Sequence, residues 1–115
     1  MKVLIVDDSS QMRRMMRQFL PSTAKEICEC EDGIDALGCY EKFLPDWVLM
    51  DWEMKQMNGL AASKQIIGKF PEAKILIVTQ YNDRELRQAA AEIGVCGFVL
   101  KEDLAELRQL LDVQS

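Results

Sequence analysis

The chain has 115 residues, of which 14 are basic, 19 are acidic and none is histidine. The net charge of −5 argues against direct binding of nucleic acid, because phosphate neutralisation needs clustered Lys and Arg. The missing histidine excludes a Ser-His-Asp triad, a histidine metal site and a phosphohistidine on this chain.

Strand-like and helix-like patterns alternate along the whole sequence. The apolar run KVLIV predicts a buried strand, whereas KEICEC alternates charged and apolar residues, as in a strand near a sheet edge. In chain order the predicted elements are strand 2–6, helix 9–20, strand 25–30, helix 33–44, strand 47–51, helix 60–69, strand 74–80, helix 82–93, strand 96–101 and helix 103–112.

This alternation predicts the fold class. Strands separated by helices form a parallel sheet with helices on both faces, because each crossover connection is right-handed. We therefore expect an α/β fold with a doubly wound, five-stranded parallel sheet and five helices. The sequence shows no linker, internal repeat or low-complexity segment, so residues 1–115 are expected to form a single domain.

The helix predicted over 9–20 has two distinct faces. Ser9 or Ser10 would cap its start, and Pro21 follows its end. The side chains on one face, which we expect in the core, are Met12, Met15, Met16 and Phe19. Those on the other face are Arg13, Arg14 and Arg17. The arginine face is either simply solvated or the surface on which a partner kinase docks.

Targeting and redox signals both indicate a cytoplasmic protein. No apolar run approaches the ~20 residues that a membrane span needs. The N-terminus enters a strand pattern at once and shows no signal peptide. The four cysteines lack the CxxC spacing of zinc and thioredoxin sites, so we expect small buried side chains in a reducing compartment.

Side chains of complementary chemistry follow the predicted strands. In an open parallel sheet, binding sites lie beyond the carboxyl ends of the strands. The candidate residues at these ends are Asp7, Asp8, Asp51, Thr79 and Lys101. Three carboxylates around one pocket repel one another, and a hard cation such as Mg²⁺ cancels that repulsion. Asp51 stands alone at its strand end, which suits a carboxylate nucleophile that forms an acyl phosphate.

Each of these residues also has an ordinary structural interpretation. A single Asp after a strand is most often a helix cap or a turn residue, and the Asp7-Asp8 pair could cap the first helix. A single Thr or Lys at a strand end usually has no special role. The coincidence of complementary residues at four strand ends favours a phosphoryl and metal site over these separate explanations.

Four segments carry a resemblance to a known family. They are LIVDDSSQMRR, VLMDWEMKQMNGL, ILIVTQ and GFVLK. Over its whole length the chain resembles the receiver domain of bacterial two-component response regulators, such as the chemotaxis regulators. The resemblance implies a flavodoxin-like fold with the strand order 2-1-3-4-5.

The resemblance also implies a mechanism. A sensor histidine kinase or a histidine phosphotransfer protein would donate a phosphoryl group to Asp51, which the chain would then slowly hydrolyse. Mg²⁺ would be held by Asp8, Asp51 and the backbone carbonyl of Glu53, with Asp7 acting mainly through water. Thr79 and Lys101 would contact the phosphoryl oxygens. We expect no turnover of an independent substrate.

The signal would leave through a switch. The resemblance implies that Thr79 and Phe98 couple phosphorylation to the face built by the fourth helix, fifth strand and fifth helix, which would also serve a homodimer. An output domain or partner would read that face. Glu102 follows Lys101 where many members have proline, as in regulators with a DNA-binding helix-turn-helix domain, so we expect a role in transcription regulation. Lys55 and Phe98 replace a common proline and a common tyrosine.

Two other functions remain open. The first is a phosphatase with an aspartyl-phosphate intermediate, because Glu53 stands two residues after Asp51, where such enzymes often carry a second acid. The second is a degenerate receiver that binds partners without phosphorylation, although the presence of the full residue set argues against it.

Overall fold

The computed structural model describes residues 1–114, so Ser115, the last residue of the predicted domain 1–115, lies outside the described residues. In chain order the elements are β1 (Lys2–Val6), α1 (Ser10–Gln18), β2 (Glu26–Cys30), α2 (Gly33–Phe43), β3 (Trp47–Asp51), α3 (Gly59–Lys69), β4 (Ile75–Thr79), α4 (Arg84–Ile93), β5 (Gly97–Leu100), a 3-10 turn (Lys101–Asp103) and α5 (Glu106–Gln114). No helix within this range is long and apolar enough to cross a membrane.

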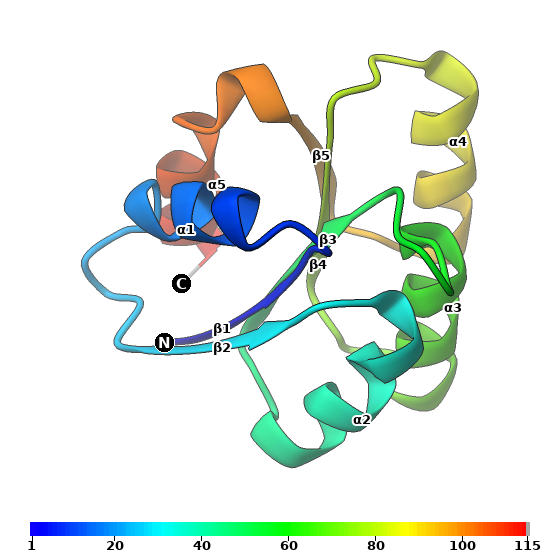
Figure 1. The fold of residues 1–115 in the computed structure, drawn as a ribbon, viewed down its shortest axis with the longest axis horizontal. Helices are drawn as coiled ribbons and strands as arrows, with labels where there is room; N and C mark the ends of the chain where they lie inside the picture. The colour runs from blue at the N-terminus through cyan, green and yellow to red at the C-terminus, as the bar shows by residue number, and fades with distance from the viewer. Residues whose placement is uncertain (115) are drawn as a thin grey trace.

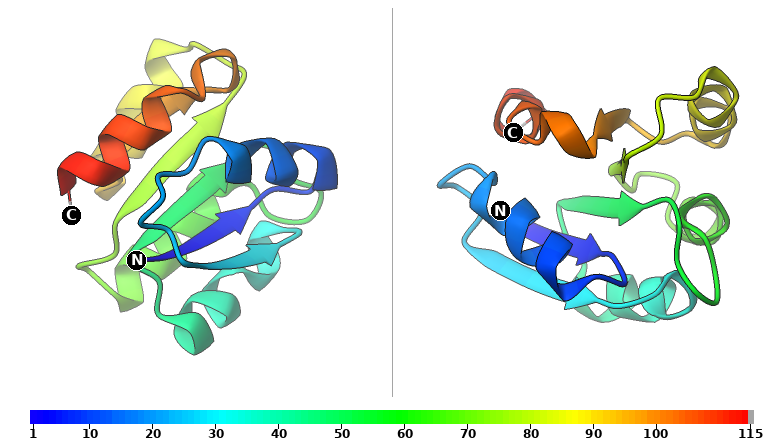
Figure 2. Two further views of the ribbon diagram at one scale, coloured as in Figure 1. Left: turned by 90° about the vertical axis from the view of Figure 1, so that its left-hand side faces the viewer. Right: turned by 45° about the horizontal axis from the view of Figure 1, so that its top comes forward.

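The five strands form one parallel sheet in the order β2-β1-β3-β4-β5, which confirms the predicted fold class and strand order (Figure 1). α1 and α5 cover one face of the sheet, and α2, α3 and α4 cover the other (Figure 2). One apolar cluster lies under α1 and α5 and includes Met16, Leu107 and Leu111. A second lies on the opposite face and includes Tyr40 and Ile66. The sheet is therefore doubly wound.

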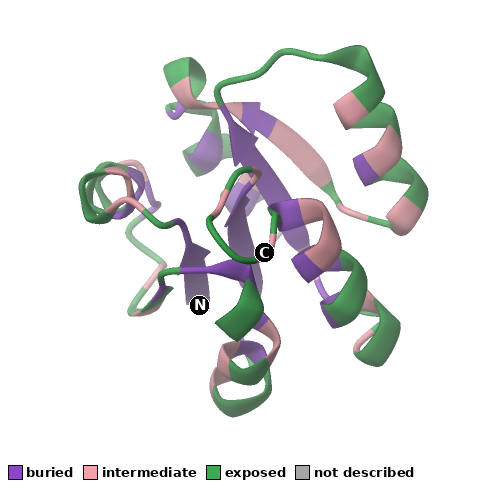
Figure 3. Cartoon of the chain, turned by 45° about the vertical axis from the view of Figure 1, so that its right-hand side comes forward, coloured by how far each residue is buried: buried purple, intermediate pink, exposed green. Residues whose placement is uncertain are grey.

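The position of each strand in the sheet agrees with its sequence pattern. Every residue of the central strands β3 and β4 is buried, as continuous apolar runs require in a sheet covered on both faces (Figure 3). β2 lies at one edge, and its charged residues Glu26 and Glu29 are exposed. The alternating KEICEC pattern was therefore correctly interpreted as an edge strand.

The helix ends follow from local capping. Ser9 caps α1 by accepting a hydrogen bond from the Met12 backbone N–H at 3.2 Å. Gly94 ends α4 with φ 98°, a left-handed conformation that glycine adopts without strain. α5 begins later than predicted, because the chain first makes the 3-10 turn that leads the buried Leu104 into the core.

Two burial predictions need correction. Met16 of α1 is fully buried as expected, but Met15 is 40% exposed, since it lies beside a groove between α1 and the start of α5. Cys30 is buried, whereas Cys96 is exposed where the chain enters β5, and Cys28 and Cys39 are half-buried. The expectation that all the cysteines are buried is therefore wrong, although all four carry free thiols.

Candidate functional site

Four strands end on the same side of the sheet, and their carboxyl ends bring the predicted residues together. Asp7 follows β1, Asp51 and Thr79 are the last residues of β3 and β4, and Lys101 follows β5. Together with the adjacent Asp8, these side chains line one open pocket. Residues that are up to 94 positions apart in the sequence thus meet because the strands run parallel.

Lys101 bridges two of the carboxylates. Its Nζ lies 2.9 Å from Asp51 Oδ1 and 3.3 Å from Asp7 Oδ2. Burial by itself would lower the pKa of Lys101, but the hydrogen bond and charge of Asp51 and the charge of Asp7 outweigh it and raise the pKa. The lysine is therefore held in its charged form at the centre of the pocket.

The three carboxylates are crowded. One oxygen of each of Asp7, Asp8 and Asp51 lies within 4.8 Å of the others. Asp7 is 0% exposed and Asp51 is 3% exposed, whereas Asp8 faces solvent. Burial raises the pKa of Asp51 to about 6, and the charges of Asp7 and Asp8 add to this rise, while Lys101 opposes it. Burial also raises the pKa of Asp7.

This donor set fits a hard divalent cation. Asp7 Oδ2 is buried and has no hydrogen-bond partner among the described residues, although the Lys101 ammonium stands 3.3 Å away. A buried carboxylate oxygen without a hydrogen bond is costly, and a cation or its bound water would satisfy it. Asp8 adds an exposed carboxylate on the open side of the pocket, where water can complete the coordination of Mg²⁺.

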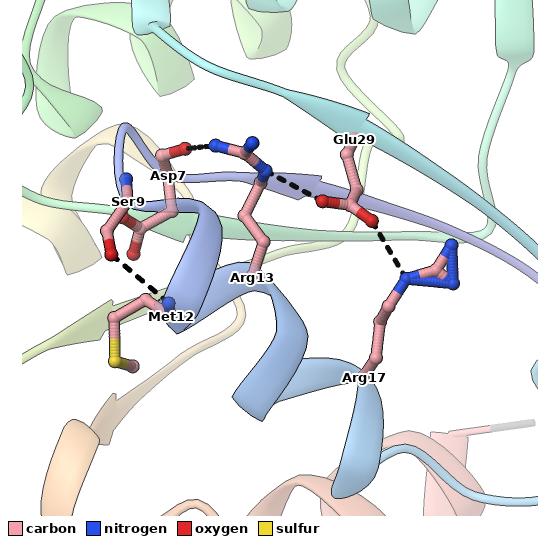
Figure 4. A network of polar contacts seen from close by, with 6 residues as sticks. All are labelled: Asp7, Ser9, Met12, Arg13, Arg17 and Glu29. Carbon is pink, nitrogen blue, oxygen red and sulfur yellow. Dashed lines mark hydrogen bonds and ion pairs between the residues drawn. The ribbon is translucent and has the colours of Figure 1, made fainter.

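The turn between β1 and α1 is held by a polar network (Figure 4). Asp7 Oδ1 accepts a hydrogen bond from the Ser9 backbone N–H at 2.9 Å. The backbone carbonyl of Asp7 accepts one from Arg13 Nη1 at 2.6 Å, and Arg13 Nε donates to Glu29 Oε1 at 2.7 Å. Glu29 Oε2 accepts in turn from Arg17 Nε at 2.8 Å.

This network corrects the interpretation of the arginine face. Arg13 is only 9% exposed, because its guanidinium reaches back to Asp7 and across to β2, so its predicted place on a solvated face is wrong. Arg17 is exposed but paired with Glu29, and Arg14 is exposed. Arg13 therefore helps to hold the β1–α1 turn in its conformation.

The loop between β3 and α3, residues 52–58, forms another wall of the pocket. Glu53 and Lys55 of this loop are exposed and line the pocket. The Gly59 backbone N–H donates to the Trp52 carbonyl at 2.8 Å, which closes the loop. A Cβ on Gly59 would collide with the Asp51 carbonyl, so this close approach requires glycine.

The two proposed switch residues lie at different depths. Thr79 is buried, and its Oγ1 accepts a hydrogen bond from the Tyr81 backbone N–H at 3.2 Å. Phe98 of β5 is half-buried against the core cluster under α2, α3 and α4. The Arg87 guanidinium of α4 stands 4.7 Å from the centre of the Phe98 ring. This contact links β5 to α4 through a cation–π interaction.

Sequence reasoning missed two residues near the site. Arg13 was grouped with its neighbours by helical spacing, which does not show where a long side chain ends. Asp32 was not among the candidate site residues, yet its side chain contacts the loop that bounds the pocket. The available signal was an Asp directly before a predicted helix that begins with glycine.

The strand order and the position of the site define a flavodoxin-like α/β domain. The chain matches the family model of the response regulator receiver domain over residues 3–112. It therefore belongs to this family, the receiver domains of two-component systems.

Individual relatives agree with this assignment. The chain is 34% identical over 116 residues to an uncharacterized transcriptional regulatory protein, YhcZ of Bacillus subtilis, in a match that covers 96% of this chain and 54% of YhcZ. It is 33% identical over 102 residues to the chemotaxis protein CheY of Listeria monocytogenes, covering 88% of this chain and 86% of that protein. The chain thus spans about half the length of YhcZ but most of the length of CheY.

A solved structure shares the fold. The chain superimposes with a TM-score of 0.89 and 25% identity on the crystal structure of a CheX–CheY–BeF3–Mg²⁺ complex from Borrelia burgdorferi. The match covers 99% of this chain and 89% of that chain.

Proposed function

We propose that this receiver domain is a phosphorylation-activated switch that accepts a phosphoryl group on Asp51 in a Mg²⁺-dependent reaction. The observation that carries the proposal is the arrangement around Asp51. Its Oδ1 lies 2.9 Å from Lys101 Nζ, and the Asp7 and Asp8 carboxylates stand within 4.8 Å. A donor histidine would belong to a partner, either a sensor histidine kinase or a histidine phosphotransfer protein, since this chain has no histidine.

The residues of the pocket position and neutralise the reacting groups. An Asp51 carboxylate oxygen forms the new O–P bond while the N–P bond of the partner's phosphohistidine breaks. The electron pair of the broken bond stays on the imidazole nitrogen. Lys101 holds Asp51 Oδ1, which leaves Oδ2 to attack. Thr79 and Lys101 then contact the phosphoryl oxygens by hydrogen bonds.

Mg²⁺ would be held by Asp8, Asp51 and the backbone carbonyl of Glu53, with Asp7 acting mainly through water, and it would supply positive charge to the phosphoryl oxygens. Asp7 Oδ2 supports this assignment, because it is buried and makes an ion pair with Lys101 but no hydrogen bond among the described residues. The CheX–CheY–BeF3–Mg²⁺ complex from Borrelia burgdorferi, in which a chain of the same fold occurs, also contains Mg²⁺.

In this proposal a kinase docks on α1, but Arg13 does not belong to the docking surface. Arg14 and Arg17 are exposed, whereas Arg13 is buried under its contacts with Asp7 and Glu29. The exposed Met15 lies between Arg14 and Arg17 in sequence and offers an apolar contact. We assign docking to the outer face of α1 without Arg13.

The output follows the state of Asp51. Thr79 and Phe98 couple phosphorylation to the α4-β5-α5 face, which serves an output partner or a homodimer, and slow hydrolysis of the acyl phosphate resets the switch. We propose that the chain regulates transcription in the cytoplasm as the receiver of a longer regulator. The length of YhcZ, of which this chain spans 54%, supports this.

The test is phosphorylation with acetyl phosphate and Mg²⁺, read by intact mass. We expect the wild type to gain one phosphoryl group and Asp51→Asn to gain none. No adduct on a folded, Mg²⁺-binding wild type would instead favour a degenerate receiver that binds partners without phosphorylation. An adduct of equal yield on Asp51→Asn would show that another residue is the acceptor.

A second candidate is an aspartyl-phosphate phosphatase. The observation in its favour is that Glu53 lines the same pocket as Asp51, two residues further along the chain. Sustained release of phosphate from a phosphomonoester, at many turnovers per chain, would support this enzyme. A single phosphorylation event per chain supports the switch.

A further inference from the structure

Asp32 lies outside the pocket, between β2 and α2, and is only 6% exposed. Its Oδ1 accepts a hydrogen bond from the Ile34 backbone N–H at 3.0 Å, which makes it an ordinary cap of α2. Such a cap uses one carboxylate oxygen and needs no burial. The Asp32 carboxylate can accept further hydrogen bonds, and it accepts them from a different part of the chain.

The same carboxylate binds the loop that follows Asp51. Asp32 Oδ1 accepts a second hydrogen bond from the Met57 backbone N–H at 3.0 Å, and Oδ2 accepts one from the Gln56 backbone N–H at 3.0 Å. Both donors belong to the 52–58 loop, more than 20 residues away in sequence. The carboxylate thus joins the start of α2 to the far half of this loop.

The ionisation of Asp32 agrees with this role. Burial by itself would raise its pKa, but the backbone N–H groups of Ile34, Gln56 and Met57 outweigh burial and lower the pKa. The contacts are therefore hydrogen bonds to an ionised acceptor, which are stronger than those between neutral groups.

A separate feature shows that the loop and α2 are closely packed here. A Cβ built on Gly33 would collide with the carbonyl oxygen of Met57, so the two backbones approach at a distance that only glycine permits. The hydrogen bond from the Gly59 N–H to the Trp52 carbonyl joins the two ends of the loop. Glu53 and Lys55, which line the pocket, lie between these two anchors.

We propose that Asp32 is a positioning residue that fixes the 52–58 loop so that the Glu53 backbone carbonyl faces the cation site. The inference rests on the proposed Mg²⁺-dependent phosphorylation of Asp51. Asp32 does not line the pocket, and it acts through the backbone of Gln56 and Met57. Groups that orient metal ligands from outside the first coordination sphere commonly control metal affinity.

The key variant is Asp32→Ser, with Asp83→Ser as its matched control. Serine keeps the helix cap but is too short to reach the loop. Asp83 caps α4 in the same way, through a 2.8 Å hydrogen bond from the Glu85 N–H, but it is exposed. Both variants remove one negative charge and one capping carboxylate, so they differ in the contact with the loop.

The measurements are Mg²⁺ titration by calorimetry and amide hydrogen exchange, both on folded protein without phosphodonor. We expect Asp32→Ser to weaken Mg²⁺ binding by about 10-fold or more, as outer-sphere changes commonly do. The amides of Gln56 and Met57 should exchange faster, while those of β1 and β3 stay protected. Asp83→Ser should match the wild type in both measurements.

Asp32→Asn provides a second variant of the same shape if the serine variant folds poorly. It keeps one acceptor oxygen and replaces the other by a donor that faces a backbone N–H, so we expect a smaller loss of Mg²⁺ affinity. Wild-type affinity in the folded Asp32 variants, or an equal loss in Asp83→Ser, would overturn the inference. A wild type that binds no Mg²⁺ would instead contradict the proposed function.

Discussion

Asp51 occupies an environment that disfavours its own charge. Its carboxylate is nearly fully buried, one ammonium group contacts it, and two further carboxylates stand nearby. Since burial raises the pKa of Asp51 from 3.8 to about 6, the metal-free fold favours the protonated carboxyl more than the unfolded chain does. The free energy of unfolding therefore decreases as the pH rises from about 4 to about 6.

Asp51→Asn should remove this loss of stability. In the metal-free protein we expect the variant to exceed the wild type in free energy of unfolding by about 1 to 3 kcal/mol at pH 7.5, and by about half as much at pH 5. Urea unfolding with EDTA at both pH values measures the difference. Asp35→Asn, which changes an exposed carboxylate in the first turn of α2, serves as the control variant. A gain for Asp51→Asn that is equal at both pH values would contradict the argument.

The meeting of Asp51, Thr79 and Lys101 could be predicted from the sequence because parallel strands carry their carboxyl ends to one edge. That argument needs only the ends of the strands. The contact of Arg13 with Glu29 could not be predicted in this way, since it depends on how far α1 stands from β2 and on the path of a flexible side chain. The exposure of Met15 was missed for a similar reason. Helical spacing shows on which face of α1 a side chain lies, but not how far the neighbouring elements cover that face.

At the scale of elements, Glu29 fastens α1 to the edge strand β2. Its two oxygens accept hydrogen bonds from Arg13 and Arg17 on successive turns of the helix (Figure 4). The two arginines differ in exposure, since the Arg13 side chain is nearly buried and that of Arg17 is not. We therefore expect the two Arg–Glu29 ion pairs to contribute differently to the free energy of unfolding, although their geometry is similar.

Arg13→Ala should destabilise the fold more than Arg17→Ala. Loss of Arg13 leaves the Asp7 carbonyl and one Glu29 oxygen without their charged donor, at a cost of about 1.5 to 3 kcal/mol. Loss of Arg17 breaks an exposed ion pair, which contributes about 0 to 1 kcal/mol. Urea unfolding at neutral pH compares the two variants, and Arg14→Ala serves as the exposed control on the same helix. Equal losses for Arg13→Ala and Arg17→Ala would show that burial does not govern this network.

Most element boundaries could be predicted because the capping residues are explicit. Ser9 and Gly94 stand where the helices begin and end. The start of α5 could not be predicted, because the 3-10 turn after β5 has no side-chain cap. The direction of this turn depends on how Leu104 packs into the core. The attachment of Asp32 to the 52–58 loop is likewise a contact between distant segments, which local patterns do not show.

At the scale of the whole molecule, the fold gathers negative charge in one place. The chain as a whole has a net charge of −5, and the open end of the sheet holds three clustered carboxylates against one lysine. A ligand that binds the folded state and not the unfolded chain stabilises the fold by mass action. A cation at this site should therefore stabilise the entire domain.

Mg²⁺ should raise the free energy of unfolding by about 2.7 kcal/mol at a concentration 100 times its Kd. Asp8→Ala should lose this gain, because it removes the exposed carboxylate of the site. Without metal the same variant should be at least as stable as the wild type, since it removes one of three repelling charges. Urea unfolding with and without Mg²⁺ tests both statements. Equal stabilisation of the wild type and Asp8→Ala would place the cation elsewhere.

The charged edge of the sheet has a consequence for behaviour at high concentration. β2 exposes Glu26 and Glu29 along its length, and Lys2 pairs with Glu26 beside them. An outermost strand presents unpaired backbone groups to any other chain, and charged side chains on it disfavour strand-to-strand aggregation. The charged side chains of β2 therefore help to keep crowded copies of the domain from pairing edge to edge.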